Sequence, residues 1–490
     1  MNKKQIPRGK RPDPTRLFIY TIMTISVVVI VAILVLIISG YRYNQYDGTL
    51  SQGGLVQFNS RPSGASVYID DMQLANRTPS KITTTAGVHN FKMTRQGYHD
   101  WTTQAEVRPG SILWLNYARM VPKELKTTTV ADFDQLSGAV MSENHKLYAI
   151  KTDPATPSFS VVNIDSNTPK VEPVALSEGS YTIAPEGQPS VFELVRWDYD
   201  NRYVLIKHTY GESKTEWLVA DSRGDRPTFN VATSLGLDVQ SADFTLDSNR
   251  SLYVLTAQHD LRRVSIDAVT ATGPLLTNVQ SFDQYDRSTI TYTTLADSET
   301  QQRSAGYLTK GDDSSRVVKS VTDIANKPLH ISIGKYYGKT YTAVAYGAQM
   351  EVLVGDLSPS GADEESELIS LATVTIPSDV TKLGFSPSEN RYVYAENAAG
   401  VVVRDLELRK TSTVNLEGYI PGALRWIDEQ HFVDTSAALA MYDFDGANNH
   451  QLAPATFKAP VVISPNNKYI YHLVVSETGG SIQRISMLLD

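Results

Sequence analysis

The chain has 490 residues, a formal net charge of -8 and no cysteine. The lack of cysteine excludes disulfides, thiolate metal sites and cysteine nucleophiles. The acidic residues are scattered through the sequence, which argues against nucleic acid as a partner because such binding needs a concentrated basic surface. Tyrosine is frequent, with 26 residues, and Val, Ile, Thr and Tyr favour strands. We therefore expect a mainly β protein.

An uncharged apolar stretch over residues 17–38 is long enough to span a bilayer as one helix. Its anchor positions include Leu17, Ile22, Val28, Leu34 and Ile38. The preceding tail, residues 1–16, carries the basic residues Lys3, Lys4, Arg8, Lys10, Arg11 and Arg16 against a lone Asp13. This asymmetry predicts a cytoplasmic N-terminus and an extracytoplasmic remainder.

The expected anchor covers residues 17–40 and makes the lipid bilayer the first partner of the chain, through one helix. A cleaved signal peptide is the alternative, because Ser39 and Gly40 are small enough to permit cleavage. The apolar stretch is longer than the hydrophobic region of a typical signal peptide. We therefore predict an uncleaved signal-anchor in a cell membrane.

After a linker over residues 41–54, the chain alternates between apolar and polar residues. Residues 55–60 and 66–71 are typical of strands joined by a Pro/Gly turn, and residues 87–93 repeat the alternation. We expect a small β-sandwich over residues 55–122.

The turns and strands of this segment resemble those of the PEGA domain. The matching positions are Ser60, Pro62, Gly64, Ala65, Thr78, Pro79, Gly97 and Tyr98. Ser63 stands where the family's name has Glu, and Asp71 stands where Gly is usual. Because aspartate tolerates the left-handed backbone conformation, we expect the turn at Asp71 to form. The resemblance implies a domain of bacterial or archaeal surface proteins without a known catalytic role.

His89, His99 and Trp101 are the residues of this segment that could bind a ligand. We interpret both histidines as surface or core residues, because the sequence places no second ligand beside them at the spacing of a metal site. We expect Trp101 to pack against Tyr98, with stacking on a sugar as the alternative.

From residue 124 onward a unit recurs that contains an apolar strand, a Ser-Pro or Asp-x-Asn turn and a strand with Tyr. The clearest copies are residues 383–394 and 461–471, and weaker copies begin at Ala139, Leu194 and Ala242. Their spacing of roughly 35–50 residues is typical of propeller blades. The last units, with the Asp-Gly-x-Asn turn of residues 441–452, are similar to the repeats of TolB- and WD40-like propellers.

The units predict a β-propeller over residues 123–490. Their bounds are near 136–176, 190–234, 239–276, 278–321, 328–376, 379–416, 422–452 and 459–490. Eight blades fit best, and seven also fit. The last unit lacks an outer strand, so we predict that residues 124–130 close the ring by pairing with it, which removes two exposed sheet edges.

We find no Gly-x-Ser-x-Gly elbow, His-Glu-x-x-His motif or Walker lysine, and we expect no catalytic, cofactor or metal site. Propeller glycosidases assemble acids from several blades, which makes Asp198, Asp200, Asp243 and Asp247 candidates in that general sense only. We interpret each of them as a turn residue between strands.

Asp443, Asp445 and Asn448 allow a calcium loop as an alternative to a turn. The loop lacks the twelfth-position Glu of an EF-hand, and an Asp-Gly hairpin explains the same residues. The acidic loop of residues 358–367 is interpreted as a surface excursion, with a partner contact as the alternative.

Two hypotheses of function follow. The preferred one is a non-enzymatic, membrane-anchored cell-envelope protein that presents its PEGA-like domain and propeller to a protein, a peptide or a cell-wall glycan. The alternative is a propeller-based glycan hydrolase or lyase, which would need two or more convergent acids in a concave mouth.

Overall fold

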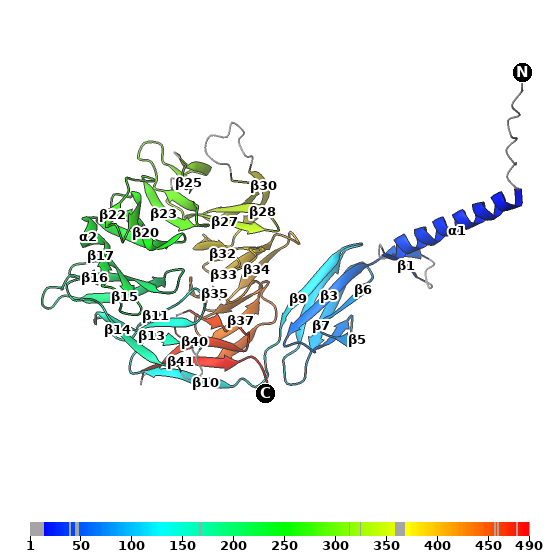
Figure 1. The fold of residues 1–490 in the computed structure, drawn as a ribbon, viewed down its shortest axis with the longest axis horizontal. Coiled ribbons are helices and arrows are strands. Elements are labelled where there is room, and N and C mark those ends of the chain that lie inside the picture. Colours follow the sequence, from blue (N-terminus) through cyan, green and yellow to red (C-terminus); the bar gives the residue numbers. More distant parts are fainter. Residues whose placement is uncertain are drawn as a thin grey trace, which may run out of the picture. The chain divides into compact units, whose positions relative to one another are not determined.

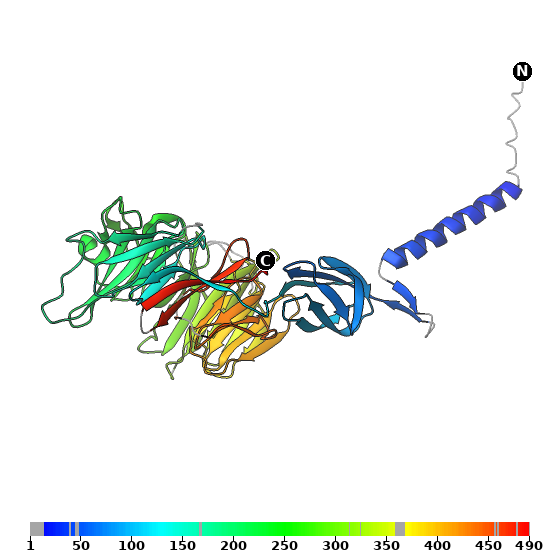
Figure 2. The same cartoon turned by 90° about the horizontal axis from the view of Figure 1, so that it is seen from below.

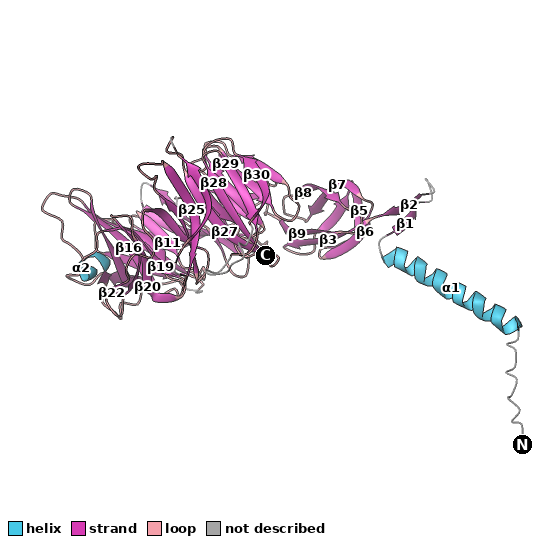
Figure 3. Ribbon diagram, turned by 90° about the horizontal axis from the view of Figure 1, so that it is seen from above, coloured by secondary structure: helices cyan, strands magenta, loops and turns pink. Residues whose placement is uncertain are grey.

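The computed structural model describes residues 14–38, 41–44, 49–165, 169–312, 314–323, 325–357, 368–454, 457, 460–476 and 479–489. The chain divides into two compact units, Met1–Lys123 and Glu124–Asp490. Strands dominate both units (Figure 3), which confirms the predicted mainly β fold class.

The N-terminal helix α1, Pro14–Ile38, is apolar around its whole circumference. The stretch Phe18–Ile38 has a mean hydropathy of 3.2 and buries none of its surface in the protein, so its length and composition suit a membrane span. Of the predicted anchor residues, Ile22, Val28, Leu34 and Ile38 are exposed, and the side chain of Leu17 lies outside what is described.

Arg16, in the first turn of α1, is exposed. The other predicted basic residues, Lys3, Lys4, Arg8, Lys10 and Arg11, lie outside the described residues. After the helix, β1 (Tyr41–Asn44) and β2 (Thr49–Gln52) pair as an antiparallel hairpin within the segment expected to be a linker.

Seven strands form the predicted sandwich. They are β3 Gly54–Arg61, β4 Ser66–Ile69, β5 Met72–Arg77, β6 Ser80–Thr84, β7 Gly87–Thr94, β8 Trp101–Val107 and β9 Ile112–Arg119. One sheet has the order β6-β3-β9 and the other β5-β4-β7-β8. Alternate residues of β3 are buried, as expected of a strand with one face on a core. The core between the sheets contains Phe58, Phe91 and Trp101.

In the unit Glu124–Asp490, the described strands form eight four-stranded sheets around a centre (Figure 1). The first seven sheets, in chain order, are β11 Gly138–Met141, β12 Leu147–Lys151, β13 Ser158–Asn163 and β14 Val171–Ala175; β15 Ser190–Trp197, β16 Tyr203–Tyr210, β17 Lys214–Asp221 and β18 Phe229–Asn230; β19 Val239–Thr245, β20 Ser248–Thr256, β21 Leu261–Ser265 and β22 Thr270–Ala271; β23 Val279–Gln284, β24 Thr289–Thr294, β25 Gln302–Thr309 and β26 Arg316–Thr322; β27 Leu329–Tyr336, β28 Lys339–Tyr346, β29 Gln349–Val354 and β30 Ile369–Thr375; β31 Lys382–Phe385, β32 Tyr392–Asn397, β33 Gly400–Asp405 and β34 Thr411–Asn415; and β35 Leu424–Trp426, β36 His431–Asp434, β37 Leu439–Asp443 and β38 His450–Ala453. The short helix α2, Val231–Leu235, follows β18.

The eighth sheet contains β39 (Val462–Ile463), β40 (Tyr469–Ser476), β41 (Gly479–Ser486) and the early strand β10 (Thr127–Phe133). β10 lies antiparallel to β41, cyan beside red in Figure 2. The predicted closure of the ring is therefore confirmed, and the described chain forms an eight-bladed propeller. The sheet edges that would stay open in an incomplete last blade are paired.

Two tyrosines link the first and last blades across the closure. The Tyr148 hydroxyl donates to the Pro460 carbonyl at 2.8 Å, and the Tyr471 hydroxyl donates to the Ile164 carbonyl at 3.1 Å. Both tyrosines belong to one buried apolar cluster shared by the two blades. Since a single sheet cannot bury both faces, this mutual covering of neighbouring blades stabilises the ring.

The recurring turn has one physical cause in four blades. A Ser or Asp side chain before the turn accepts the backbone N–H of a residue at the start of the next strand, at 2.8–3.0 Å. The pairs are Ser142 with Leu147, Asp198 with Tyr203, Ser386 with Tyr392 and Ser464 with Tyr469. The weak copy at Ala242 differs, because Thr245 and Ser248 pair directly in a tight hairpin.

Candidate binding site at the propeller axis

The strands β11, β15, β27 and β35, each the first strand of its sheet, lie nearest the centre of the ring in Figure 1. A cavity of about 220 Å³ opens between the first strands β23, β27 and β31 of three successive blades, with β24 behind them. Its lining residues are Ser281, Phe282, Asp283, Thr291, Tyr292, Thr293, His330, Ile331, Thr381, Lys382 and Leu383. The cavity therefore faces the propeller axis.

The lining is rich in hydroxyl groups around one accessible carboxylate. The Ser281 and Thr293 hydroxyls are 2.6 Å apart. Asp283 accepts the backbone N–H of Gln284 at 2.8 Å, and its side chain is exposed to the cavity. No ion pair of Asp283 is found within the described part of the chain. One carboxylate oxygen is thus available to a ligand that donates hydrogen bonds.

The pKa of Asp283 lies above its ordinary value because the surrounding blades desolvate the carboxylate. The backbone N–H of Gln284 and the charges of Arg196 and Lys382 oppose this rise. The blades therefore desolvate the Asp283 carboxylate in part, although its side chain is exposed to the cavity.

Asp243 lies on β19, the first strand of the third blade, and its pKa is also raised by burial. Nη1 of Arg196, on β15, lies 2.7 Å from Oδ2 of Asp243. The charge of Asp283 raises the pKa of Asp243 further. We interpreted Asp243 as a turn residue, and this was wrong. It occupies a ladder position opposite Tyr253, because the turn begins only after Thr245.

Lys382 supplies a cation to the cavity. Its Nζ lies 3.3 Å from Oε1 of the buried Glu396 and 5.7 Å from the ring centre of Tyr394. Burial lowers the pKa of Lys382, whereas Tyr394 and Glu396 raise it above the ordinary value overall. Gly384 permits this arrangement, since a Cβ there would lie 2.7 Å from the Tyr394 hydroxyl oxygen.

Sequence reasoning missed Arg196, Asp283 and Lys382. Each is a charged residue in the first strand of a repeat unit, in the second, fourth and sixth blades. Charged residues in these first strands are the signal that could have found them, because such a strand lies nearest the axis.

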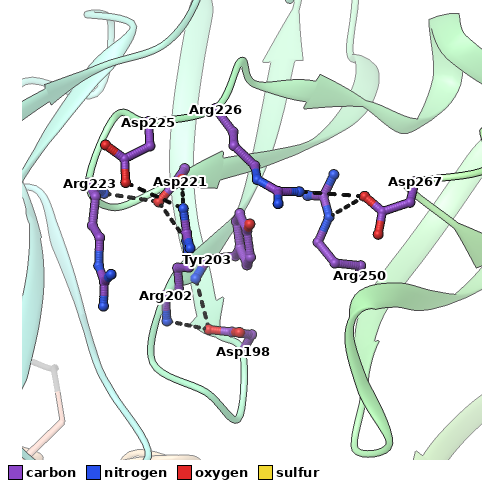
Figure 4. A network of polar contacts seen from close by, with 9 residues as sticks. All are labelled: Asp198, Arg202, Tyr203, Asp221, Arg223, Asp225, Arg226, Arg250 and Asp267. Atoms are coloured by element: carbon purple, nitrogen blue, oxygen red, sulfur yellow. Dashed lines mark hydrogen bonds and ion pairs between the residues drawn. The ribbon is translucent and has the colours of Figure 1, made fainter.

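The other predicted acids serve turns and ion pairs away from the cavity. Asp198 accepts the backbone N–H groups of Arg202 and Tyr203 at 2.7 and 2.8 Å (Figure 4). Asp200 is exposed in the same turn. Asp247 follows β19 and lies 2.8 Å from both Arg263 and Lys310. The interpretation as turn residues is confirmed for these three.

Figure 4 also shows the ion pairs beside this turn. Arg202 Nη2 lies 2.8 Å from Asp221 Oδ2 and 3.4 Å from Asp225 Oδ2. On the next blade, Arg250 Nε lies 2.9 Å from Asp267 Oδ1. Arg226 Nη1 also lies 3.6 Å from Asp267 Oδ1, so ion pairs link the two blades.

In the loop that was considered as an alternative calcium site, both carboxylate oxygens of Asp443 already have partners. Asp443 Oδ2 accepts from the Asn448 amide at 2.8 Å, and Asp443 Oδ1 lies 3.4 Å from His431 Nε2. Burial lowers the pKa of His431 and the carboxylates of Asp428 and Asp443 raise it, to about 9 overall. Within the described residues, no three His, Cys, Asp or Glu side chains converge as a metal site.

The second blade contains a Ser-His-Glu array that the sequence did not suggest. Ser190 Oγ lies 2.9 Å from His208 Nε2, and His208 Nδ1 lies 2.7 Å from Glu216 Oε1. These distances match a nucleophile with an oriented base. His208 is fully buried, however, and stacks on Phe192 with ring centres 3.9 Å apart. The array therefore stabilises the blade.

The PEGA-like residues form a hydrogen-bonded link between two turns of the sandwich. The Ser60 and Thr78 hydroxyls are 2.6 Å apart, and Thr78 Oγ1 also accepts the N–H of Ala65 at 2.9 Å. Gly64 and Gly97 have φ values of 87° and 82°, which L side chains rarely adopt. Of the remaining motif residues, Pro62 accepts the Ser60 hydroxyl through its carbonyl at 2.7 Å, Pro79 directly follows Thr78 in the sequence, and Tyr98 is buried in the core. The motif is structural.

The turn at Asp71 forms as predicted, since Asp70 and Asp71 have φ values of 47° and 66°. His99 is exposed, and Trp101 is buried in the cluster that contains Tyr98. His89 is buried beside Asp70 and lines a cavity, so its role is not limited to packing within its strand. The acidic segment 358–367 lies outside the described residues.

These features define a β protein with an apolar N-terminal helix, a small sandwich and an eight-bladed propeller. Residues 54–120 match the family model of the PEGA domain, which confirms the resemblance found in the sequence. No curated protein matches the chain.

Several solved structures are similar in fold. Oligogalacturonate lyase in complex with manganese has 10% sequence identity and a TM-score of 0.39, over 74% of this chain and 98% of that chain. The Cps50 (Swd1) β-propeller domain of Myceliophteria thermophila has 10% identity and a TM-score of 0.40, over 74% and 99%. Apo AztD from Citrobacter koseri has 9% identity and a TM-score of 0.36, over 79% and 95%.

Proposed function

We propose that this chain is a single-pass cell-envelope protein whose PEGA domain and propeller lie outside the cytoplasm and bind an envelope component without catalysis. The apolar helix α1, the basic tail before it and the PEGA match support this localisation. Nucleic acid is not proposed as a partner, because its binding needs a concentrated basic surface and the acidic residues of this chain are scattered through the sequence.

The axial cavity is the proposed binding site, and a cell-wall glycan is the ligand that its chemistry favours over a protein or a peptide. The supporting observation is the exposed Asp283 carboxylate in a cavity that Ser281, Thr291, Thr293 and Thr381 also line. A sugar presents many hydroxyl groups that both donate and accept, which matches such a lining.

The test is glycan binding to the full-length protein in lipid nanodiscs. Soluble cell-wall fragments are screened on the wild type and on Asp283→Asn, with Asp200→Asn as a matched control in an exposed turn. We expect Asp283→Asn to weaken binding at least about tenfold, since a hydrogen bond to a charged group contributes about 1.5–3 kcal/mol. Equal binding by all three proteins would refute the axial site.

A glycan hydrolase or lyase is the second candidate, and one observation favours it. Asp243 and Asp283 come from adjacent blades, both have raised pKa values, and Asp283 raises that of Asp243. A carboxylic acid with a raised pKa is the group that glycosidases use as general acid. Release of new reducing ends or unsaturated sugars from wall polymers, lost in both Asp243→Asn and Asp283→Asn, would favour the enzyme over the binding protein.

A further inference from the structure

A second cavity, of about 370 Å³, opens at one side of the sandwich. Its walls are β5 and β6, which diverge from the corner at Thr78. The lining residues are Gly53, Ile69, Asp70, Met72, Leu74, Ile82, Thr83, Thr84, Thr85 and His89. The volume lies within the range of natural ligand pockets. We call this cavity the β5–β6 cleft.

Both walls of the cleft are edges of sheets. In the described chain, β5 pairs with β4 alone and β6 pairs with β3 alone. Natural proteins protect such edges with proline, lysine or a covering segment. β5 contains no proline, its one charged residue is Arg77 at its last position, and five of its six residues are exposed. Its outer row of backbone groups is therefore open to another strand.

The floor of the cleft is an opening into the hydrophobic core. Leu74 and Ile82 are partly buried and pack against the core cluster, and Ile69 belongs to it. Met72 is exposed at the rim. An apolar side chain that enters between β5 and β6 would extend this core and remove apolar surface from water.

The end of the cleft is fixed by His89. Its Nδ1 lies 2.5 Å from Asp70 Oδ2, in the turn before β5, and its Nε2 donates to the Thr85 carbonyl after β6 at 2.8 Å. His89 therefore holds the two walls at a set distance, so that the cleft is formed before a ligand arrives.

We infer that the β5–β6 cleft binds an extended peptide segment of a partner protein, which adds as a strand to the edge of β5 and inserts a branched apolar side chain between Leu74 and Ile82. Strand addition uses the open backbone groups for affinity and the cleft for specificity. An acyl chain would fill the cleft without using the edge, and a second copy of the chain would pair β5 with β5.

The test selects random linear peptides on the full-length protein in nanodiscs and measures binding of the enriched synthetic peptides. Leu74→Trp fills the cleft, and we expect it to weaken binding at least about tenfold. Thr102→Trp is the matched control, because it adds the same side chain to the exposed face of β8, the opposite edge strand. We expect it to bind like the wild type.

A second measurement leaves the protein unchanged. Two sets of peptides are compared, one methylated on the odd-numbered and one on the even-numbered backbone nitrogens. One set should lose binding and the other should keep it, because a strand pairs with its neighbour through every second N–H. Binding that survives methylation in both phases, failure to enrich peptides with an apolar anchor, or equal binding by Leu74→Trp would each overturn the inference. Competition by an acyl detergent without any peptide binding, or dimerisation through β5, would also overturn it.

Discussion

The imidazole of His89 and the carboxylate of Asp70 lie 2.5 Å apart, with the second ring nitrogen donating to the Thr85 carbonyl. Neither the carboxylate nor the carbonyl can donate, so both ring nitrogens carry hydrogen and the ring is an imidazolium. Burial lowers the pKa of His89, whereas Asp70 and Thr85 raise it above 6.5 overall. Hydrogen bonds from His89 and Asn90 hold the pKa of Asp70 below 3.8.

We predict that this pair makes the sandwich sensitive to pH. The His89 contribution is complete below pH 6.5 and is lost as the pH rises through the higher folded pKa of the ring. The Asp70 contribution is present above pH 3.8 and is lost as the pH falls through its lower folded pKa. The protection of the β4–β5 turn against hydrogen exchange, expressed relative to the intrinsic exchange rate at each pH in the full-length protein, should be highest between these limits.

Below pH 6.5, His89→Gln should reduce the local stability of this turn by about 1 kcal/mol and so lower its protection against exchange. The substitution should also abolish the loss of local stability that occurs when the pH rises through the pKa of His89. His99→Gln is the control, because His99 is exposed. An unchanged pH profile in His89→Gln would show that the ring is neutral in the folded state.

We predict that the closure of the ring depends on the small size of Gly480. A Cβ at this position would lie 2.5 Å from the Leu136 Cβ, so Gly480→Ala should destabilise the propeller by about 1–3 kcal/mol through overpacking. Gly273→Ala, where no atom lies within 4 Å of the new Cβ, is the matched control and should be nearly neutral. Denaturant unfolding of the propeller measures both, and equal effects would contradict the prediction.

His472 leads to a prediction of increased stability, whereas Gly480→Ala should destabilise the propeller. It is fully buried on β40, and neither ring nitrogen has a hydrogen-bond partner among the described residues. Burial lowers the pKa of His472 to about 4. Its protonation therefore favours unfolding, and the propeller should lose stability as the pH falls from 6.5 towards 4.

His472→Leu should stabilise the propeller at neutral pH by about 1–3 kcal/mol, because it removes two buried polar groups without partners. It should also flatten the acid side of the stability profile. His450→Leu, at a partly exposed position of β38, is the control and should change stability less. Destabilisation by His472→Leu, measured by denaturant unfolding, would indicate an ordered partner for the ring.

The blades could be predicted from the sequence because their pattern is local. Ser386 and Ser464 recur five to six residues before a strand tyrosine, and the hydrogen bond that causes this recurrence lies within one hairpin. The PEGA turns were predictable for the same reason, since Gly64 and Asp71 report backbone conformations that few residues adopt.

The axial site could not be predicted in this way, because its geometry depends on residues far apart in the sequence. Asp243 and Asp283 share a sequence environment with turn acids, and only the ring places them on neighbouring inner strands. His89 and Asp70 are likewise separated by 19 positions and meet through the pairing of β4 with β7.

We predict, finally, that the membrane topology follows from the basic tail of residues 1–16. The chain has no cysteine, so a single introduced one reports its own compartment. Asp200→Cys, in an exposed propeller turn, should react with a membrane-impermeant maleimide on intact cells, whereas Asn2→Cys should react only after lysis. Replacing Lys3, Lys4, Arg8, Lys10, Arg11 and Arg16 by Gln should reduce this bias, because the positive charges set the orientation. Labelling of Asn2→Cys on intact cells would reverse the proposed topology, and secretion of a soluble labelled propeller would establish the cleaved signal peptide instead.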